Sequence, residues 1–314
     1  MMENKEILVL LGLVVVASGC SHTASQSTSS SSVTIQNFSA FPSNVLSDQQ
    51  VRLKLTLKNN GDSDAESVQA RLFNVAFSGE RNWNLDGERS IRFGTLQSAD
   101  EERNLPARES TKYWSLDSPS LDEGATIPYR FITRVYYKYQ TTGTSSITLM
   151  GQRRYRQQGN PERPTLDTTS GPIQMEIRTR SPIVFYPQDD SSRTTKMCVI
   201  VTNKGTGTPF VHNQAYDEDN SEYNLERENS NKVKLRVKNQ GNTNFTSAES
   251  GDESQTVLVD MLGNRGIGCF SIDVRNWNNN VGPQQDVPVL IEADYGYVKE
   301  TSSSATVSGT DRFR

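Results

Sequence analysis

The feature of this chain that most limits its fold is an alternation of apolar and polar residues along short segments. From Val51 to Lys58 every second residue is Val or Leu, and the residues between them are Arg, Lys or Thr. The segment ends at Asn59-Asn60-Gly61-Asp62, which is a typical turn sequence. A period of two places one set of side chains in a core and the other in solvent, so it predicts a half-buried β-strand.

Similar β-rich segments recur at 33–38, 68–73, 129–139 and 147–150, and no long segment has the helical period of about 3.6 residues. Hydrophobic residues make up 33% of the chain, a proportion that suits antiparallel sheets with one solvated face. The sequence therefore predicts an all-β fold.

Short segments of the first half recur in the second half in the same order, 144 to 160 positions later. The pairs are Phe41-Pro42 with Tyr186-Pro187, Asn59-Asn60-Gly61 with Asn203-Lys204-Gly205, Tyr113–Asp117 with Cys269–Asp273, Pro128 with Pro288, and Tyr137-Lys138-Tyr139 with Tyr295-Gly296-Tyr297. This order predicts a duplicated domain. We expect Trp114 and Phe270 to be equivalent core residues, and we expect the Tyr-x-Tyr rings to pack along one face of a strand.

A polar segment, 151–172, separates the last strand of the first copy from the first strand of the second copy, Ile173–Thr179. We predict two tandem immunoglobulin-like antiparallel β-sandwiches at 33–150 and 173–314, joined by this linker. The linker contains four arginines, which are either solvated or available to an acidic partner or membrane phosphates. They are Arg153, Arg154, Arg156 and Arg163.

The N-terminal residues read as an export signal. An apolar run from Ile7 to Ala17 is too short to span a membrane as a helix but suits a signal peptide over 1–19. Ser18-Gly19-Cys20 then predicts lipid attachment at Cys20, followed by a Ser/Thr-rich tether over 20–32. The alternatives are a secretory signal that is cleaved without lipid attachment and an uncleaved anchor. The expected location is extracytoplasmic, on the outer face of the cell membrane.

After Cys20 the chain has two cysteines, Cys198 and Cys269. An even number in an exported protein makes them a candidate disulfide, and two separately buried thiols are the alternative. Asn37 and Asn244 begin glycosylation sequons. The net charge of −4 gives no basic surplus for binding nucleic acid.

An extended lead-in that ends in an aromatic–proline pair, followed by an alternating strand that ends in Asn-x-Gly, resembles the cell-adhesion-related domain of the CARDB type. It also resembles the immunoglobulin-like repeats of archaeal surface and S-layer-associated proteins. Trp114–Asp117 through Pro128 to Tyr137–Tyr139 is similar to the closing half of such domains. Asn74–Lys112 and Pro209–Gly268 are longer than such a domain needs. The resemblance implies extracytoplasmic adhesion, spacing or assembly, and it supplies no catalytic residues.

The sequence contains no motif that indicates an enzyme. His212 is the one histidine after the leader and tether, and no nucleophile-elbow Gly-x-Ser-x-Gly is present. No Gly-rich phosphate loop precedes a helix, and no Cys/His group has zinc spacing. The acidic stretches Asp100-Glu101-Glu102 and Asp122-Glu123 read as solvated charge. We therefore expect no enzymatic activity and no cofactor.

One acidic segment has oxygen ligands at calcium-loop spacing. The candidate ligands are Asp217, Asp219, Ser221, the Tyr223 carbonyl and Glu228. Glu222 stands where a calcium loop requires glycine, and no helices are predicted around it. The alternatives are thus a bound calcium ion and a solvated acidic loop.

The sequence favours a non-enzymatic, membrane-anchored envelope protein that acts as a spacer or as an adhesion or interaction module. Its expected partners are the membrane, through the lipid anchor, and envelope proteins or surface glycans. The alternative is a carbohydrate-binding module or a subunit of an envelope complex. Exposed aromatic rings at Trp83, Trp277 or the Tyr-x-Tyr pairs would favour that alternative.

Overall fold

The computed structural model describes residues 32–75, 82–100, 103–158, 160, 162–185, 193–239, 244–247, 256–274 and 284–310. Within these ranges the described backbone is dominated by β-strands, so the expected all-β fold is confirmed. The strands are β1 (Val33–Phe41), β2 (Asn44–Leu46), β3 (Gln50–Asn59), β4 (Ala65–Phe73), β5 (Asn84–Asp86), β6 (Ser90–Leu96), β7 (Glu109–Asp117), β8 (Thr126–Gly151), β9 (Asp167–Thr168), β10 (Ile173–Ile177), β11 (Ile183–Phe185), β12 (Arg193–Asn203), β13 (Thr208–Phe210), β14 (Tyr216–Asp217), β15 (Glu222–Tyr223), β16 (Lys232–Asn239), β17 (Asn244–Ser247), β18 (Thr256–Asp260), β19 (Arg265–Val274) and β20 (Gln284–Ser308). The helices are α1 (Gln152–Gln158), α2 (His212–Ala215) and the 3-10 turn η1 (Arg227–Asn229).

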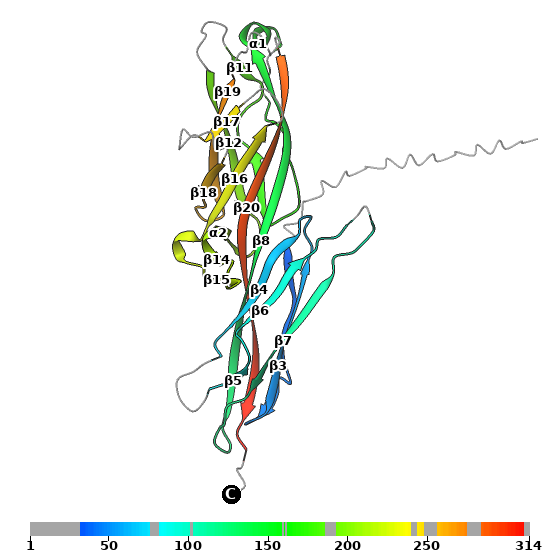
Figure 1. Ribbon diagram of the computed structural model, residues 1–314, viewed down its shortest axis with the longest axis vertical. Helices are drawn as coiled ribbons and strands as arrows, with labels where there is room; N and C mark the ends of the chain where they lie inside the picture. Colours follow the sequence, from blue (N-terminus) through cyan, green and yellow to red (C-terminus); the bar gives the residue numbers. More distant parts are fainter. Residues whose placement is uncertain are drawn as a thin grey trace, which may run out of the picture.

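The strands form two β-sandwiches stacked end to end (Figure 1). One four-stranded sheet has the order β1-β3-β7-β5 and belongs to the first sandwich, and another has the order β10-β12-β19-β17 and belongs to the second. A ten-stranded sheet that contains β18-β16-β20-β8-β4-β6 runs through both sandwiches. The alternation that predicts β3 matches the burial of its side chains. The four apolar side chains from Val51 to Leu57 are 0% exposed.

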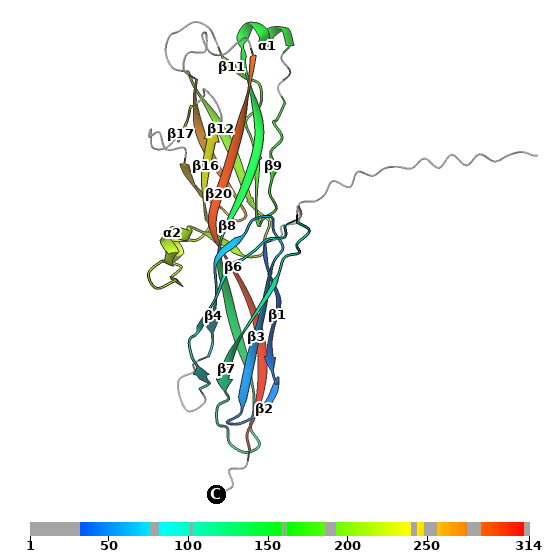
Figure 2. The same cartoon turned by 45° about the vertical axis from the view of Figure 1, so that its right-hand side comes forward.

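The long strands β8 and β20 belong to both sandwiches. They pair antiparallel along the whole of β20, from Gln284 opposite Met150 to Ser308 opposite Thr126. The first half of β8 pairs with β4, whereas its second half pairs with β9 and β11. The first half of β20 pairs with β16, and its last residues pair with β2. Each copy of the repeat therefore contributes half of its last strand to the sandwich of the other copy (Figure 2).

This strand exchange produces an elongated rod. A strand of 26 residues with a rise of about 3.3 Å per residue is roughly 85 Å long. We call the middle of the rod the waist and define it as residues 136–139 of β8 and 295–298 of β20, which face one another. The predicted boundaries 33–150 and 173–314 follow the two copies along the chain, whereas each sandwich contains strand segments of both copies.

The register of the strands shows how the two copies correspond. Trp114 on β7 lies opposite Leu53 on β3, and Phe270 on β19 lies opposite Met197 on β12. Trp114 is 2% exposed and Phe270 is 0% exposed. The two aromatic residues thus occupy the same place in equivalent sheets.

One expected correspondence has a better match in the structure. Tyr186-Pro187 lies outside the described residues. Phe41-Pro42 is a cis peptide that follows β1, and Ser181-Pro182 is a cis peptide that follows β10. Val33 and Ile173 begin these two strands opposite Asn59 and Asn203, so Ser181-Pro182 is the counterpart of Phe41-Pro42.

The segment predicted as an interdomain linker does not run between the sandwiches. After α1 the chain turns back along the second half of β8, where β9 pairs with Gly143 and Thr144. The Thr169 N–H donates to the Thr142 carbonyl at 2.9 Å, and the Ser145 hydroxyl donates to the Thr165 carbonyl at 2.7 Å. The part of this segment that follows α1, which we call the strap, is therefore packed on the second sandwich.

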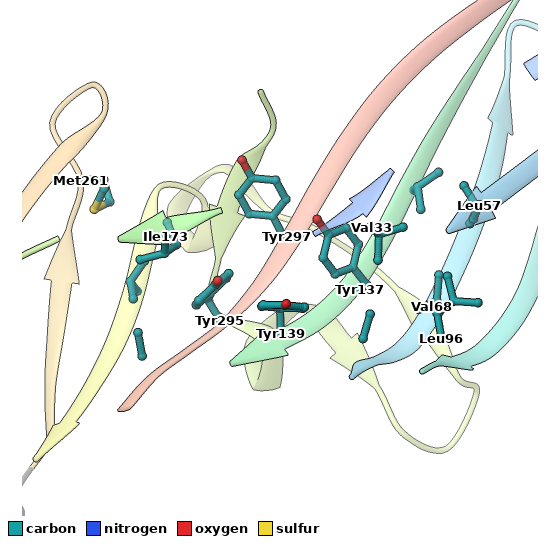
Figure 3. Packing of buried hydrophobic residues seen from close by; sticks show 14 of the residues in the cluster. Val33, Leu57, Val68, Leu96, Tyr137, Tyr139, Ile173, Met261, Tyr295 and Tyr297 are labelled. Carbon is teal, nitrogen blue, oxygen red and sulfur yellow. The ribbon is translucent and has the colours of Figure 1, made fainter. Parts of the chain in front are cut away.

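The two hydrophobic cores meet at the waist. The rings of Tyr137, Tyr139, Tyr295 and Tyr297 lie side by side on β8 and β20, and each is at most 1% exposed. Figure 3 shows Val33, Leu57, Val68 and Leu96 of the first sandwich on one side of the rings and Ile173 and Met261 of the second on the other. The expected packing of the Tyr-x-Tyr rings along one face is therefore present, and it makes the two cores continuous.

Candidate interaction surface

Consecutive residues of β8 point to opposite faces of the shared sheet at the waist. The Tyr137 hydroxyl lies in the core, 2.9 Å from the Ser32 hydroxyl. The Tyr136 ring points to the outer face, yet it is only 5% exposed. A segment of the second copy therefore covers the outer face of the sheet at this point.

That segment is 211–231, which we call the waist insert. It contains α2, β14, β15 and η1 and lies between β13 and β16, where the first copy has the single strand β4. In the first copy Glu66 of β4 pairs with Lys138, and in the second copy Phe210 of β13 pairs with Gly296. A Cβ atom at position 296 would overlap the Phe210 ring. This contact explains why the second Tyr-x-Tyr sequence has glycine in its centre.

The waist insert binds the first copy through backbone and side-chain hydrogen bonds. The Gln69 amide donates to the Ser221 carbonyl at 3.2 Å, and its Oε1 accepts the Tyr223 N–H at 3.1 Å. The Tyr223 hydroxyl donates to the Ser67 carbonyl at 3.0 Å. Ser67 has a φ of 51° in a bulge of β4, so Tyr223 holds the first copy where its strand is irregular.

Aromatic rings complete this contact. Tyr136 stacks on Tyr223 with centroids 5.2 Å apart, and Phe210 meets Tyr223 edge-on at 5.9 Å. Burial is the main reason that the pKa of Tyr136 and the pKa of Tyr223 lie above the usual value. Both hydroxyls are therefore neutral at physiological pH. The waist insert therefore connects the second copy to the first through packed rings and hydrogen bonds.

An open groove of about 700 Å³ lies beside the waist insert on the outer face of the shared sheet. Its floor comes from outward side chains of β8, β20, β16 and β18, which are neighbours in the shared sheet, and residues of α2 line it on the side of the waist insert. The lining residues are Lys138, Gln140, Val211, His212, Asn213, Gln214, Lys234, Arg236, Lys238, Thr256, Leu258, Glu292, Asp294 and Tyr295.

The charges in the groove are arranged by strand. The outward positions of β16 carry Lys234, Arg236 and Lys238, and those of β20 carry Glu292 and Asp294. The Lys238 ammonium lies 2.5 Å from Glu292 Oε1, and the Arg236 guanidinium lies 3.9 Å from Glu292 Oε2. Lys234 forms no ion pair with another described residue. The floor of the groove is therefore a row of cations beside a shorter row of carboxylates.

His212 lines this groove between a polar and an aromatic neighbour. Its Nδ1 lies 3.2 Å from Asn213 Oδ1, and its ring stacks on Tyr216 at 5.0 Å. Burial lowers the pKa of His212, so the ring is neutral at pH 7. The carboxylates in the groove bond to cations and to Gln140, whose amide donates to Asp294 at 2.8 Å.

The calcium ligands predicted from the sequence do not converge. Asp217 and Glu222 pair in the β14–β15 hairpin, and the Asp217 carboxylate accepts hydrogen bonds from the backbone of Asp219 and Asn220. The Asn220 side chain also donates to Asp217 at 2.7 Å, and these hydrogen bonds lower the pKa of Asp217. Among the described residues no three His, Cys, Asp or Glu side chains gather as a metal site. The spacing failed as a predictor because the loop closes on its own N–H groups.

The aromatic residues that would favour sugar binding are buried wherever the structure describes them. Trp83 is 4% exposed and meets Tyr129 at 5.4 Å and Phe131 at 5.0 Å, edge-on in both cases. The four waist tyrosines are equally inaccessible. Trp277 lies outside the described residues. An exposed aromatic platform at Trp83 or at the Tyr-x-Tyr pairs is therefore wrong.

The other predicted sites have different outcomes. A disulfide joins Cys198 on β12 to Cys269 directly opposite on β19, with Cα atoms 4.1 Å apart. Asn37 is exposed on β1, and its amide donates to the Ser39 hydroxyl at 3.1 Å. Asn244 begins β17, and its side chain is outside the described part. Cys20 and the whole signal segment also lie outside it. No described helix is long and apolar enough to cross a membrane.

Sequence reasoning missed the waist insert and the groove. The signal that pointed to them was the extra length of 209–268 relative to the first copy. Length alone does not reveal where an insertion packs, because the contacts with Gln69 and Tyr136 join residues that are far apart in the chain.

No protein-family model and no curated protein matches the chain, so the resemblance to the CARDB type has no support from family models. Solved structures align with it remotely. The secreted serine protease VesC from Vibrio cholerae is 8% identical with a TM-score of 0.20, and the alignment covers 79% of this chain and 47% of VesC. The chain thus spans about half the length of VesC.

Two further alignments are equally remote. A protein of unknown function from Porphyromonas gingivalis W83 is 12% identical with a TM-score of 0.19, over 77% of this chain and 83% of that one. The CupB6 tip adhesin from Pseudomonas aeruginosa is 7% identical with a TM-score of 0.15, over 88% and 96%. Similarity at this level assigns no activity, substrate or partner.

Proposed function

We propose that the protein is a non-enzymatic envelope protein, anchored through Cys20 to the outer face of the membrane, that acts as a spacer and interaction module. The observation that carries this proposal is the exchange of β8 and β20 between the two sandwiches. A rod that shares two paired strands across its waist resists bending there, because a sharp bend would strain the backbone hydrogen bonds of the shared strands. It therefore holds whatever binds to it at fixed positions.

The waist insert strengthens the same argument. Tyr223 and Gln69 join the second copy to the first on the outer face, while the tyrosines join the two cores on the inner face. The waist is thus held from both sides of the shared sheet. A stiff joint of this kind is what a spacer needs and is unnecessary for two domains that act independently.

The composition and the disulfide support the location. A disulfide persists in the oxidising conditions outside the cytoplasm, and the Cys198–Cys269 bond lies on the outward side of its sheet. The net charge of −4 favours neither nucleic acid nor an anionic polymer as a general partner. The glycan-binding alternative loses its main support because its described aromatic candidates are buried.

The groove is the surface to which we assign partner binding. Lys234 and Arg236 offer cations on its floor, and Leu258, opposite Lys234 on β18, is 40% exposed. An envelope protein that presents carboxylates next to an apolar side chain fits this combination, because charge complementarity then orients an apolar contact. Surface connections of this kind are where binding function concentrates on rigid scaffolds.

Affinity capture from the native envelope tests the proposal. The lipid-anchored protein is compared with a Lys234→Glu/Arg236→Glu variant and with an Arg178→Glu/Arg180→Glu control at exposed positions that follow β10. We expect the wild type and the control to retain the same envelope proteins, identified by mass spectrometry, and the groove variant to lose at least one of them. Equal capture by all three proteins would show that the groove does not bind a partner.

Attachment is tested separately by intact-mass analysis and membrane fractionation. We expect the mature protein to begin at Cys20 and to carry lipid, and we expect Cys20→Ser to release it from the membrane. Stable attachment requires two acyl chains, since one chain alone binds marginally. A mature protein that begins at another residue, or a Cys20→Ser variant that stays on the membrane, would contradict the anchor.

A further inference from the structure

The chain enters the described structure at the waist of the rod and not at one of its tips. We propose that the anchored rod therefore lies side-on to the lipid bilayer, with the waist insert and the groove facing away from the lipid. This inference rests on the proposed attachment of lipid at Cys20. It names the surface that the anchored protein presents to its partners.

The entry point is fixed by hydrogen bonds on the core side of the shared sheet. The Ser32 carbonyl accepts the Asn60 N–H at 3.2 Å, and the Ser32 hydroxyl lies 2.9 Å from that of Tyr137. The Lys299 ammonium donates to the Val33 carbonyl at 2.8 Å. The first described residues are thus held by both long strands, in the middle of the rod (Figures 1 and 2).

The length of the chain between Cys20 and Ser32 limits how the rod can stand. Twelve residue steps span at most about 43 Å even when fully extended. From Lys138 at the waist to either end of β8 is roughly 40 Å, because twelve or thirteen residues rise about 3.3 Å each. An upright rod would need the whole connection to be taut along one sandwich. A rod that lies on its side needs no such extension.

The same entry point decides which side faces the lipid. Ser32 contacts Tyr137 on the inner face of β8, whereas the waist insert covers Tyr136 on the outer face. Figure 2 shows β1, which begins directly after Ser32, and α2 on opposite sides of the long strands β8 and β20. If the waist is held close to the lipid at Ser32, the waist insert and the groove beside it point outward.

The surface nearest the lipid has suitable chemistry. The outward positions of β3 carry Arg52, Lys54 and Lys58. Phe41, opposite Arg52, is 76% exposed, and Tyr113, opposite Lys54, is 55% exposed. Basic side chains next to exposed aromatic rings favour the headgroup region of an anionic bilayer. On β7 Glu109 lies opposite Lys58 and partly offsets this charge.

Energy transfer from the protein to the bilayer tests the orientation. The lipidated full-length protein is bound to vesicles of phosphatidylcholine and phosphatidylglycerol that contain an acceptor-labelled lipid. Donor dyes are attached at three exposed positions in separate variants: Asp122→Cys near one tip, Arg156→Cys near the other, and Glu218→Cys on the waist insert. We expect the two tip labels to transfer within twofold of one another and the waist-insert label to transfer least.

Other results separate the two proposals. High transfer from one tip and little from the other would mean an upright rod and would overturn the side-on orientation while leaving the anchor intact. The highest transfer from Glu218→Cys would place the waist insert against the lipid and would overturn the proposed face. If protein that carries intact Cys20 is recovered without lipid and fails to bind vesicles, the anchoring hypothesis itself is wrong. Repeating residues 21–31 once in the chain is a matched control, since the longer connection should make the tip signals less equal.

Discussion

Asn59 and Asn203 make the same two hydrogen bonds in the two halves of the molecule. The Asn59 amide donates to the Ser63 carbonyl at 2.8 Å, and the Asn203 amide donates to the Gly207 carbonyl at 2.9 Å. In each case Oδ1 accepts the N–H of the glycine two residues later, at 3.1 Å. Both turns lie at the waist, and each turn positions a backbone N–H that donates to a buried tyrosine hydroxyl.

These two tyrosines make the stability of the protein sensitive to alkaline pH. The Ser63 N–H donates to the Tyr139 hydroxyl at 3.2 Å, and the Gly207 N–H donates to the Tyr297 hydroxyl at 3.0 Å. Burial is the main reason that the pKa of Tyr139 and the pKa of Tyr297 each rise to about 12. The unfolded chain has tyrosines with a pKa of about 10 and releases these protons first. Each residue therefore stabilises the fold fully below pH of about 10, and this contribution falls as pH rises toward 12.

We expect each of the two residues to lose about 2–3 kcal/mol of its contribution between these pH values. Urea unfolding followed by circular dichroism at successive pH values measures the loss. The matched control is Tyr139→Phe/Tyr297→Phe, which is less stable at neutral pH because two N–H groups lose their acceptor. Its stability should decline less in the alkaline range. An equal alkaline decline in the variant and the wild type would contradict the assignment.

The equivalent aromatic residues of the two cores give a second prediction. Trp114→Ala removes a ring that is 2% exposed, contacts Phe38 edge-on at 6.3 Å and donates its indole N–H to the Arg89 carbonyl at 3.1 Å. We expect a loss of about 3–5 kcal/mol in the free energy of unfolding, from lost burial and from the cavity. Tyr113→Ala at the neighbouring exposed position should change it by less than about 0.5 kcal/mol. Similar effects of the two substitutions in denaturant unfolding would mean that Trp114 is not a core anchor.

The equivalence of Trp114 and Phe270 was predictable from the sequence because both lie in strands whose side chains alternate by period two. The turns were predictable for the same local reason, since Asn-x-Gly at 59–61 and 203–205 closes each strand in the same way. What a local pattern cannot specify is which partner a long strand takes. β8 pairs within its own copy through Glu66 and with the other copy through Gln284, and both pairings satisfy the same alternation.

The candidate site could not be predicted for the same reason, because its contacts join residues that are far apart in the chain. The waist insert depends on the approach of Tyr223 to Gln69 and Tyr136, which lie 154 and 87 positions earlier in the chain. The tyrosine pairs and Trp83 are aromatic positions in β-rich sequence, and an aromatic ring in a strand is equally suited to a core or to an exposed platform. Burial distinguishes the two, and burial depends on the opposite sheet. The structure places these rings in the core.

The cross-strand disulfide gives a third prediction. Cys198 and Cys269 are separated by 71 positions in the chain, so the bond should stabilise the folded protein by about 4 kcal/mol through restriction of the unfolded chain. Cys198→Ser/Cys269→Ser should lower the denaturation midpoint by the corresponding amount. Reduction of the wild type serves as the control and should reproduce this loss. Rapid alkylation of both cysteines in the native, unreduced protein would show that the bond is absent.

The exchange of β8 and β20 predicts that the two copies stay together after the chain is cut between them. A protease site inserted between Gln158 and Glu162, at the exposed end of the strap, leaves every β8–β20 pair intact. The two fragments remain joined by these strand pairs, by the tyrosine core and by the waist insert. We therefore expect both fragments to co-elute in gel filtration without denaturant. Their circular dichroism should equal that of the uncut protein. In urea the fragments should separate at a lower concentration than unfolds the uncut chain, because the cut removes the entropic advantage of a single chain. Fragments that separate in native buffer would show that the long strands do not bind the two copies to one another.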